Sequence, residues 1–144
     1  MTKRKKQFRW TPSPLIYVRT MPKRGIGGRG VFASQDIPEG AVIEQSPVII
    51  VPSKDLYAAS KVKTVLGYYA FSWTTGKNAK DAIPFGFISL CNHSYRPNAS
   101  YNIDRPSRSL FITSLRRIRK GQEITLNYNG DPDCQNPVWF HVNG

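Results

Sequence analysis

Three stretches of the chain combine residue types and spacings that could support chemistry. The first is GIGGRG (25–30), where the missing Cβ atoms would let backbone N–H and C=O groups approach a ligand closely. The second is NHSYRPN (92–98), a polar loop that offers an amide and an imidazole. The third is GQEITLNY (121–128), a pattern typical of a strand, which ends in the hydroxyl of Tyr128. Each stretch alone is weak, because flexible turns, structural histidines and edge tyrosines are common.

The glycine-rich stretch matches G-x-G-x-x-G by letter, but its surroundings argue against a dinucleotide site. Such a site needs the glycines to follow a strand and to open a helix within a βαβ unit. Here VFAS (31–34) predicts a strand, and DIPEG (36–40) then predicts a turn. We therefore expect a glycine loop between strands and reject the dinucleotide interpretation.

Cysteine and histidine could also indicate a metal centre. Cys91 and His93 lie close together, with Cys134 and His141 as the remaining candidates. The spacings Cys-x-His and Cys-x₆-His are not those of known zinc sites, so we predict no metal.

Together, in this order and spacing, the stretches resemble the SET-domain family of protein lysine methyltransferases. The blocks that carry the resemblance are GGRGVFA (27–33), DIPEG (36–40), NHSYRPN (92–98) and GQEITLNY (121–128), and it extends from about Leu15 to Phe140. Tyr95 stands where members with a zinc-binding segment after the core have a cysteine. No cysteine-rich segment precedes the core either. The chain thus resembles the compact SET proteins of viruses and bacteria.

The resemblance implies a mainly β, β-clip-like fold of several small sheets, one short helix and a C-terminal pseudoknot. It implies S-adenosylmethionine as the cofactor, which meets the substrate lysine through a narrow channel from the opposite face. The implied cofactor contacts are the backbone of Gly28, Arg29 and Gly30, together with Asn92, His93 and Trp139.

On the lysine side, the resemblance implies that Tyr128 is the catalytic tyrosine and that Tyr69 lies beside the methyl-transfer pore. Tyr101 lies where family members differ in how many methyl groups they add, so the product count stays open. Trp139 and Phe140 would close the lysine channel, with simple core packing as the equal alternative.

Short apolar runs between Gly, Pro and Asn residues predict a single mainly β domain. The predicted strands are 15–19, 31–34, 41–45, 47–51, 71–73, 84–90, 99–103, 109–116 and 124–128. Apolar residues at helical spacing predict one helix over 54–69, with Ser53 as its N-cap.

The charge of the chain is strongly uneven. Twenty-one Lys+Arg against nine Asp+Glu give a net charge of +12, of which residues 1–24 carry +8 and the rest +4. We expect a basic flexible arm over 1–12 and the SET domain over 13–144. The arm either contacts DNA through its phosphates or is only a solvated tail. No apolar run is long enough to span a membrane and no secretory signal is recognisable, so we expect an intracellular protein, in the cytoplasm, nucleoid or nucleus.

The expected substrate is a lysine in a histone tail or in another basic protein. Two other classes remain open, namely a catalytically weak SET-fold binding module recruited to nucleic acid by its arm, and a plain DNA-binding protein. The charge alone favours the last, and no helix-turn-helix pattern supports it. Pairing into a homodimer is also left open.

Overall fold

The structure is a computed structural model that describes residues 7–23 and 27–138. Within these ranges the chain is mainly β, as predicted. The strands are β1 (Ile16–Thr20), β2 (Arg29–Ala33), β3 (Val42–Pro52), β4 (Phe71–Thr74), β5 (Lys80–Pro84), β6 (Asn92–His93), β7 (Ala99–Asp104), β8 (Ser109–Ser114) and β9 (Glu123–Leu126). Three 3₁₀ turns, η1 (Ser53–Leu56), η2 (Val65–Tyr69) and η3 (Ile88–Leu90), complete the elements. None of the helical segments in the described part could cross a membrane.

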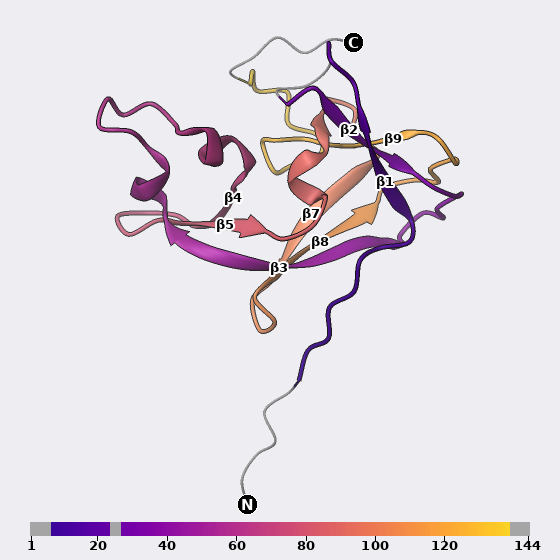
Figure 1. Ribbon diagram of the computed structural model, residues 1–144, viewed down its shortest axis with the longest axis horizontal. Helices are drawn as coiled ribbons and strands as arrows, with labels where there is room; N and C mark the ends of the chain where they lie inside the picture. The colour runs from indigo at the N-terminus through magenta and orange to yellow at the C-terminus, as the bar shows by residue number, and fades with distance from the viewer. Residues whose placement is uncertain (1–6, 24–26, 139–144) are drawn as a thin grey trace, which may run out of the picture.

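The strands form two sheets, which Figure 1 shows side by side. One has the order β1-β2-β9-β6 and the other the order β4-β5-β3-β8-β7. All the strand pairs are antiparallel except β6 with β9, which is parallel. The long strand β3 pairs with β5 along its second half and with β8 along its first half, so it joins both parts of the larger sheet.

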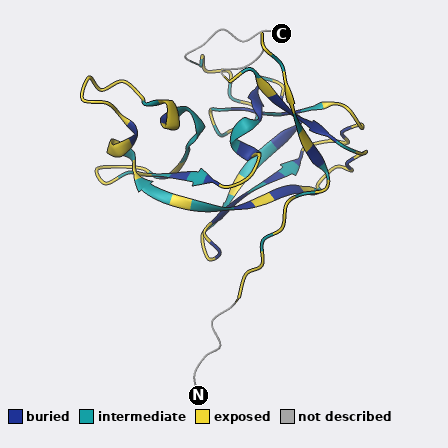
Figure 2. Ribbon diagram, in the orientation of Figure 1, coloured by how far each residue is buried: buried dark blue, intermediate teal, exposed yellow. Residues whose placement is uncertain are grey.

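One apolar core lies between the sheets, and the buried ribbon segments in Figure 2 mark its place. Alternate residues of the strands supply it, as expected for sheets with one buried face. Ile37 and Ile118 lie outside the strands, and an isolated antiparallel bridge between them closes the core at one end. Each fully buried aliphatic side chain contributes about 1.5–3 kcal/mol to folding. The largest of them are Val31, Ile37, Ile43, Ile88, Leu110, Ile112, Ile118, Ile124 and Leu126.

The helix predicted over residues 54–69 is wrong. This stretch contains only the 3₁₀ turns η1 and η2, with irregular chain between them. Ser53 is the first residue of η1 rather than its N-cap, and no side-chain hydrogen bond caps that turn. The resemblance implies one short helix, but the described residues contain only 3₁₀ turns.

The physical reason is that the apolar spacing in this stretch does not mark a buried face. Three of its apolar side chains are exposed, by 58%, 75% and 50% for Val62, Val65 and Leu66. Lys61 has a φ of 61°, which a right-handed helix excludes. Burial of an apolar face is what normally stabilises a short helix, and here it is missing.

Most predicted strands are confirmed, with two corrections. Residues 41–45 and 47–51 belong to one strand, β3, which passes through Pro47 and carries a register shift between Val42 and Glu44. Residues 84–90 are not a strand: β5 ends at Pro84, and the chain then turns into η3.

The residues after β9 fold back onto the loop that follows β6. The backbone N–H of Val138 donates to the Tyr95 hydroxyl at 3.1 Å, and Gln135 donates to the Tyr95 carbonyl at 3.2 Å. The Asn127 side chain donates to the Cys134 carbonyl at 2.7 Å and so fixes the turn between them. These contacts join the two segments expected to form the pseudoknot.

Candidate active site

The structure brings the second and third of the predicted stretches together through the pairing of β6 with β9. Asn92 lies opposite Thr125 and His93 opposite Leu126, although the two residues of each pair lie 33 positions apart in the sequence (125 − 92 and 126 − 93). Asn98 strengthens the contact, because its amide donates to the Glu123 carbonyl at 2.7 Å and accepts from the Thr125 N–H at 2.9 Å. The NHSYRPN and GQEITLNY stretches are therefore one structural unit.

The glycine stretch joins this unit at the start of β2. Asn92 donates one hydrogen bond to the Arg29 carbonyl at 2.9 Å and another to Oε1 of Glu123 at 2.7 Å. A Cβ on Gly30 would lie only 2.8 Å from that Glu123 oxygen, so a larger residue here would have to displace the Glu123 side chain. Gly28 has a φ of +64°, which other residues rarely adopt. Backbone and side chains thus approach one another very closely here.

Tyr128 is fixed at both ends. Its hydroxyl donates to the Cys91 carbonyl at 2.7 Å, and its backbone N–H donates to Nδ1 of His93 at 3.0 Å. Burial, followed by the nearby Cys91, Tyr69 and Glu123, raises the pKa of Tyr128, so the phenol stays protonated at neutral pH. Burial lowers the pKa of His93, which favours the neutral ring whose Nδ1 accepts that hydrogen bond.

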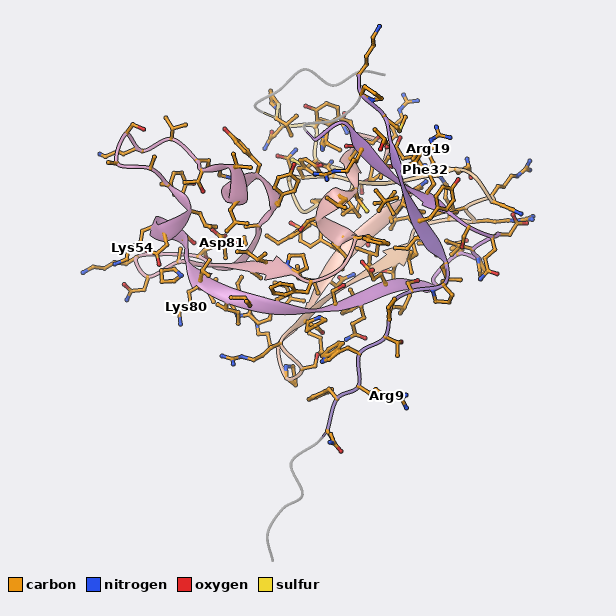
Figure 3. The ribbon with its side chains drawn as sticks, viewed as in Figure 1. Arg9, Arg19, Phe32, Lys54, Lys80 and Asp81 are labelled. Carbon is orange, nitrogen blue, oxygen red and sulfur yellow. The ribbon has the colours of Figure 1, made fainter. Side chains whose placement is uncertain are left out.

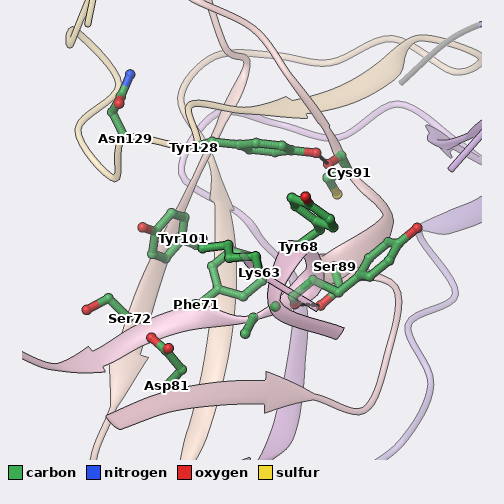
Figure 4. Close-up of a pocket in the computed structure, with 13 residues that line it drawn as sticks. Lys63, Tyr68, Phe71, Ser72, Asp81, Ser89, Cys91, Tyr101, Tyr128 and Asn129 are labelled. Carbon is green, nitrogen blue, oxygen red and sulfur yellow. Dashed lines mark hydrogen bonds between the residues drawn. The ribbon is translucent and has the colours of Figure 1, made fainter. Parts of the chain in front are cut away.

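A pocket of about 250 Å³, here called the acceptor pocket, opens in front of Tyr128 (Figure 4). Its aromatic lining comes from Tyr68, Tyr69, Phe71, Tyr101 and Tyr128. The rings of Phe71 and Tyr101 meet edge to face at 4.8 Å, and burial raises the pKa of Tyr101. Charged and polar groups also reach it, from Lys63, Ser72, Asp81 and Asn129. The pocket suits a long aliphatic side chain with a polar end.

A second, narrow cavity of about 20 Å³ lies next to the acceptor pocket. The two share Tyr68, Tyr69, Ser89 and Tyr128 as lining residues, whereas only the narrow cavity is lined by Gly27, Arg29 and Asn92. A Cβ on Gly27 would come within 2.8 Å of the Tyr69 hydroxyl, so a larger residue there would have to displace the Tyr69 side chain that lines both cavities. The narrow cavity beside the glycine stretch is therefore a neighbour of the acceptor pocket, and Tyr128 lies in the wall of both.

The predicted site residues fall into three groups. Tyr69, Tyr101 and Tyr128 line the acceptor pocket, and Arg29 and Asn92 line the narrow cavity. Gly28, Gly30 and His93 line neither of these two cavities, and the His93 side chain faces the Tyr128 backbone. Trp139 and Phe140 lie outside the described residues. All the assigned roles stay predictions.

Two further contributors were missed in the sequence. The Ser89 hydroxyl donates to the Tyr69 carbonyl at 2.6 Å and lines both cavities, and the Cys91 carbonyl holds the Tyr128 hydroxyl. Ser89 lies in the run expected to be a strand, and a backbone carbonyl leaves no signature in a sequence. Only their places directly before NHSYRPN could have pointed to them.

No cluster of metal-binding side chains forms within residues 7–23 and 27–138. Cys91 and Cys134 are free cysteines. Burial raises the pKa of the Cys91 thiol, which makes it a poor nucleophile and a poor metal ligand.

Comparison with known proteins identifies the family. The SET-domain profile matches residues 28–129. A histone-lysine N-methyltransferase of Schizosaccharomyces pombe, specific for histone H3 lysine 37, is 35% identical over 78% of this chain and 70% of that protein. A Saccharomyces cerevisiae enzyme specific for histone H3 lysine 36 is 29% identical over 88% of this chain but only 17% of its own length.

Solved structures show the same fold. A crystal structure of a Plasmodium falciparum protein assigned as a histone methyltransferase superposes with a TM-score of 0.60 at 25% identity, covering 82% of this chain and 94% of that one. A chain of the PRC2 complex, in an autoinhibited conformation bound to S-adenosylmethionine, superposes with a TM-score of 0.61 at 15% identity, covering 82% of this chain and 15% of that one. The chain belongs to the SET-domain family of protein lysine methyltransferases, whose cofactor is S-adenosylmethionine.

Proposed function

We propose that this chain transfers a methyl group from S-adenosylmethionine to the side-chain amine of a lysine in a histone or another basic, DNA-associated protein. The observation that carries the proposal is that Tyr128 lies in the wall of both the acceptor pocket and the narrow cavity next to the glycine stretch. Two reactants that enter from these two sides would meet at the Tyr128 hydroxyl. The related histone methyltransferases of two yeasts support a histone as the substrate, and the nucleus as the place of action.

The pair formed by Asn92 and Glu123 beside the narrow cavity fits the amino group of the cofactor, which when bound would supply a methyl group on a positively charged sulfur. Asn92 uses both of its amide protons, on Arg29 and on Glu123. The part of its side chain left for a ligand is therefore Oδ1, which accepts hydrogen bonds. An acceptor backed by a carboxylate suits an ammonium group. We therefore propose that Asn92 holds the amino group of the cofactor and that Glu123 orients Asn92.

Methyl transfer requires the substrate lysine as a neutral amine. With an ordinary pKa near 10.4, only about one lysine in a thousand is neutral at pH 7.4, which corresponds to a penalty of about 4 kcal/mol. The aromatic lining of the acceptor pocket disfavours the ammonium form by desolvation, and a nearby sulfonium would add like-charge repulsion. The aromatic part of the lining thus favours the neutral amine that transfer requires.

Tyr128 is suited to orient the amine rather than to take its proton. The raised pKa keeps the phenol neutral, and its own proton is directed to the Cys91 carbonyl. The oxygen of the hydroxyl can then accept from the amine and stabilise positive charge that develops nearby. Holding both reactants in line beside it supplies a further rate enhancement.

Two experiments test the proposal. Because S-adenosylmethionine would bind the folded state, it should raise the apparent melting temperature of the purified chain. Transfer of labelled methyl to core histones, nucleosomes and a ribosomal-protein mixture, followed by mass mapping, should then identify a lysine. Cofactor binding without transfer to any protein would favour the SET-fold binding module, and failure to bind the cofactor would refute the proposal.

A further inference from the structure

The acceptor pocket has a single carboxylate among its lining residues, that of Asp81. Asp81 lies on β5, opposite Ser72 of β4 and Val51 of β3. Side chains alternate along a strand, and Figure 3 shows Lys80 and Asp81 on opposite sides of β5. Figure 4 shows Asp81 beside Ser72 at the wall of the pocket. The strand therefore presents the acid, and not the adjacent lysine, to the pocket.

The Asp81 carboxylate is not used by the fold. It is half-buried, and within residues 7–23 and 27–138 no hydrogen bond or ion pair engages its oxygens. Other acids of the chain have clear structural partners: Asp36 pairs with Arg117, and Glu123 accepts from Asn92. A partly desolvated carboxylate without a protein partner gains most from a cation supplied by a ligand.

The positive net charge of the chain makes an acid at this position important for a basic substrate. A net charge of +12 opposes the approach of a basic protein substrate. One acid in the wall of the acceptor pocket offsets that repulsion locally and stabilises a correctly placed cation. Lys63, which lines the same pocket, has a positive charge and would not attract such a cation.

We propose that Asp81 is a specificity-determining residue that selects substrates with a basic side chain next to the target lysine. The inference rests on the proposed function, since it assumes that the target lysine occupies the acceptor pocket. It narrows the substrate class to segments in which an arginine or lysine neighbours the methylated residue.

Peptides that contain one lysine provide the test. Arginine is placed in turn at each of the three positions on either side of the lysine, with glutamine at the others, and kcat/KM is compared with that of the all-glutamine peptide. The chain should prefer arginine at one or more of these positions. Asp81→Asn should reduce the preference by about two- to fivefold, the range expected for a partly exposed ion pair. The preference should also fall at high salt.

Two matched variants distinguish a charge effect from general damage. Asp55→Asn removes an exposed acid on η1, outside the acceptor pocket, and should keep the preference. Lys63→Gln removes a charge of opposite sign from the pocket and should not reduce it. Melting temperatures of all variants verify that each is folded.

The outcomes separate this inference from the proposed function. A chain that methylates the peptides without preferring arginine, or whose preference survives in Asp81→Asn, overturns the role of Asp81 alone. A chain that binds the cofactor and methylates neither peptides nor whole proteins overturns both.

Discussion

Asn92 on β6 and Glu123 on β9 are joined side chain to side chain by a 2.7 Å hydrogen bond, from Nδ2 to Oε1. The same amide nitrogen donates to the Arg29 carbonyl at the start of β2. One side chain thus connects three stretches that lie far apart in the sequence. The orientation of the Asn92 side chain is set by these two hydrogen bonds. If Asn92 holds the cofactor, weakening either bond should weaken cofactor binding.

Glu123→Gln should weaken S-adenosylmethionine binding by about tenfold or more. The substitution replaces the charged acceptor of Asn92 with an amide, and hydrogen bonds to charged groups contribute about 1.5–3 kcal/mol. Calorimetric titration with the cofactor measures the change. Glu39→Gln, at an exposed turn, is the matched control and should bind normally. Equal affinities of the two variants would show that Glu123 does not orient Asn92.

Glu44→Gln should stabilise the fold at high pH more than at low pH. Glu44 is buried and accepts from the Phe87 N–H at 2.9 Å, and burial raises its pKa above 4.5. An acid whose pKa is raised by folding contributes stability below its unfolded pKa and loses it as pH rises through the folded value. Glutamine keeps an acceptor without this loss. Denaturant unfolding at pH 4 and pH 8 should therefore show the advantage of the variant growing with pH, and a pH-independent difference would contradict the assignment.

Deletion of residues 1–12 should reduce activity on nucleosomes more than activity on a free histone peptide. The deletion removes five of the basic residues and no acidic one, so it should weaken contacts with phosphates. It removes no residue that lines the acceptor pocket. The matched control changes Lys3, Arg4, Lys5 and Lys6 to glutamine and keeps the length. Initial rates on both substrates at two salt concentrations measure the effect. Equal losses on both would exclude a DNA-docking role for the arm.

Much of the fold was predictable from the sequence, because its strands are marked by β-branched runs between turn residues. The run 109–116 became β8, and 99–103 became most of β7. β6 was not predictable in the same way: it is two residues long and is defined only by its parallel partner β9. The stretch 54–69 shows the opposite failure, since helical spacing without a buried face did not produce a helix.

The candidate site was predictable as far as its side chains have recognisable types in recognisable blocks. Tyr128 lines both cavities and Asn92 lines the narrow one, and the roles that the resemblance implies for them stay predictions. The backbone carbonyl of Cys91, which holds the Tyr128 hydroxyl, and Asp81 on β5 were not predictable. The first is a main-chain atom, and the second becomes significant only because β5 faces the pocket.

In the proposed function, the Tyr128 hydroxyl lies where the methyl group of the cofactor meets the amine of the lysine. Tyr128→Phe removes that oxygen and little else. The ring remains, and so does the hydrogen bond from the backbone N–H to Nδ1 of His93. The measurement is single-turnover methyl transfer to a histone substrate, together with the cofactor Kd. The rate should fall by about a hundredfold or more, while the Kd should change by no more than about threefold. A rate close to that of the parent chain, with the cofactor bound equally well, would contradict it.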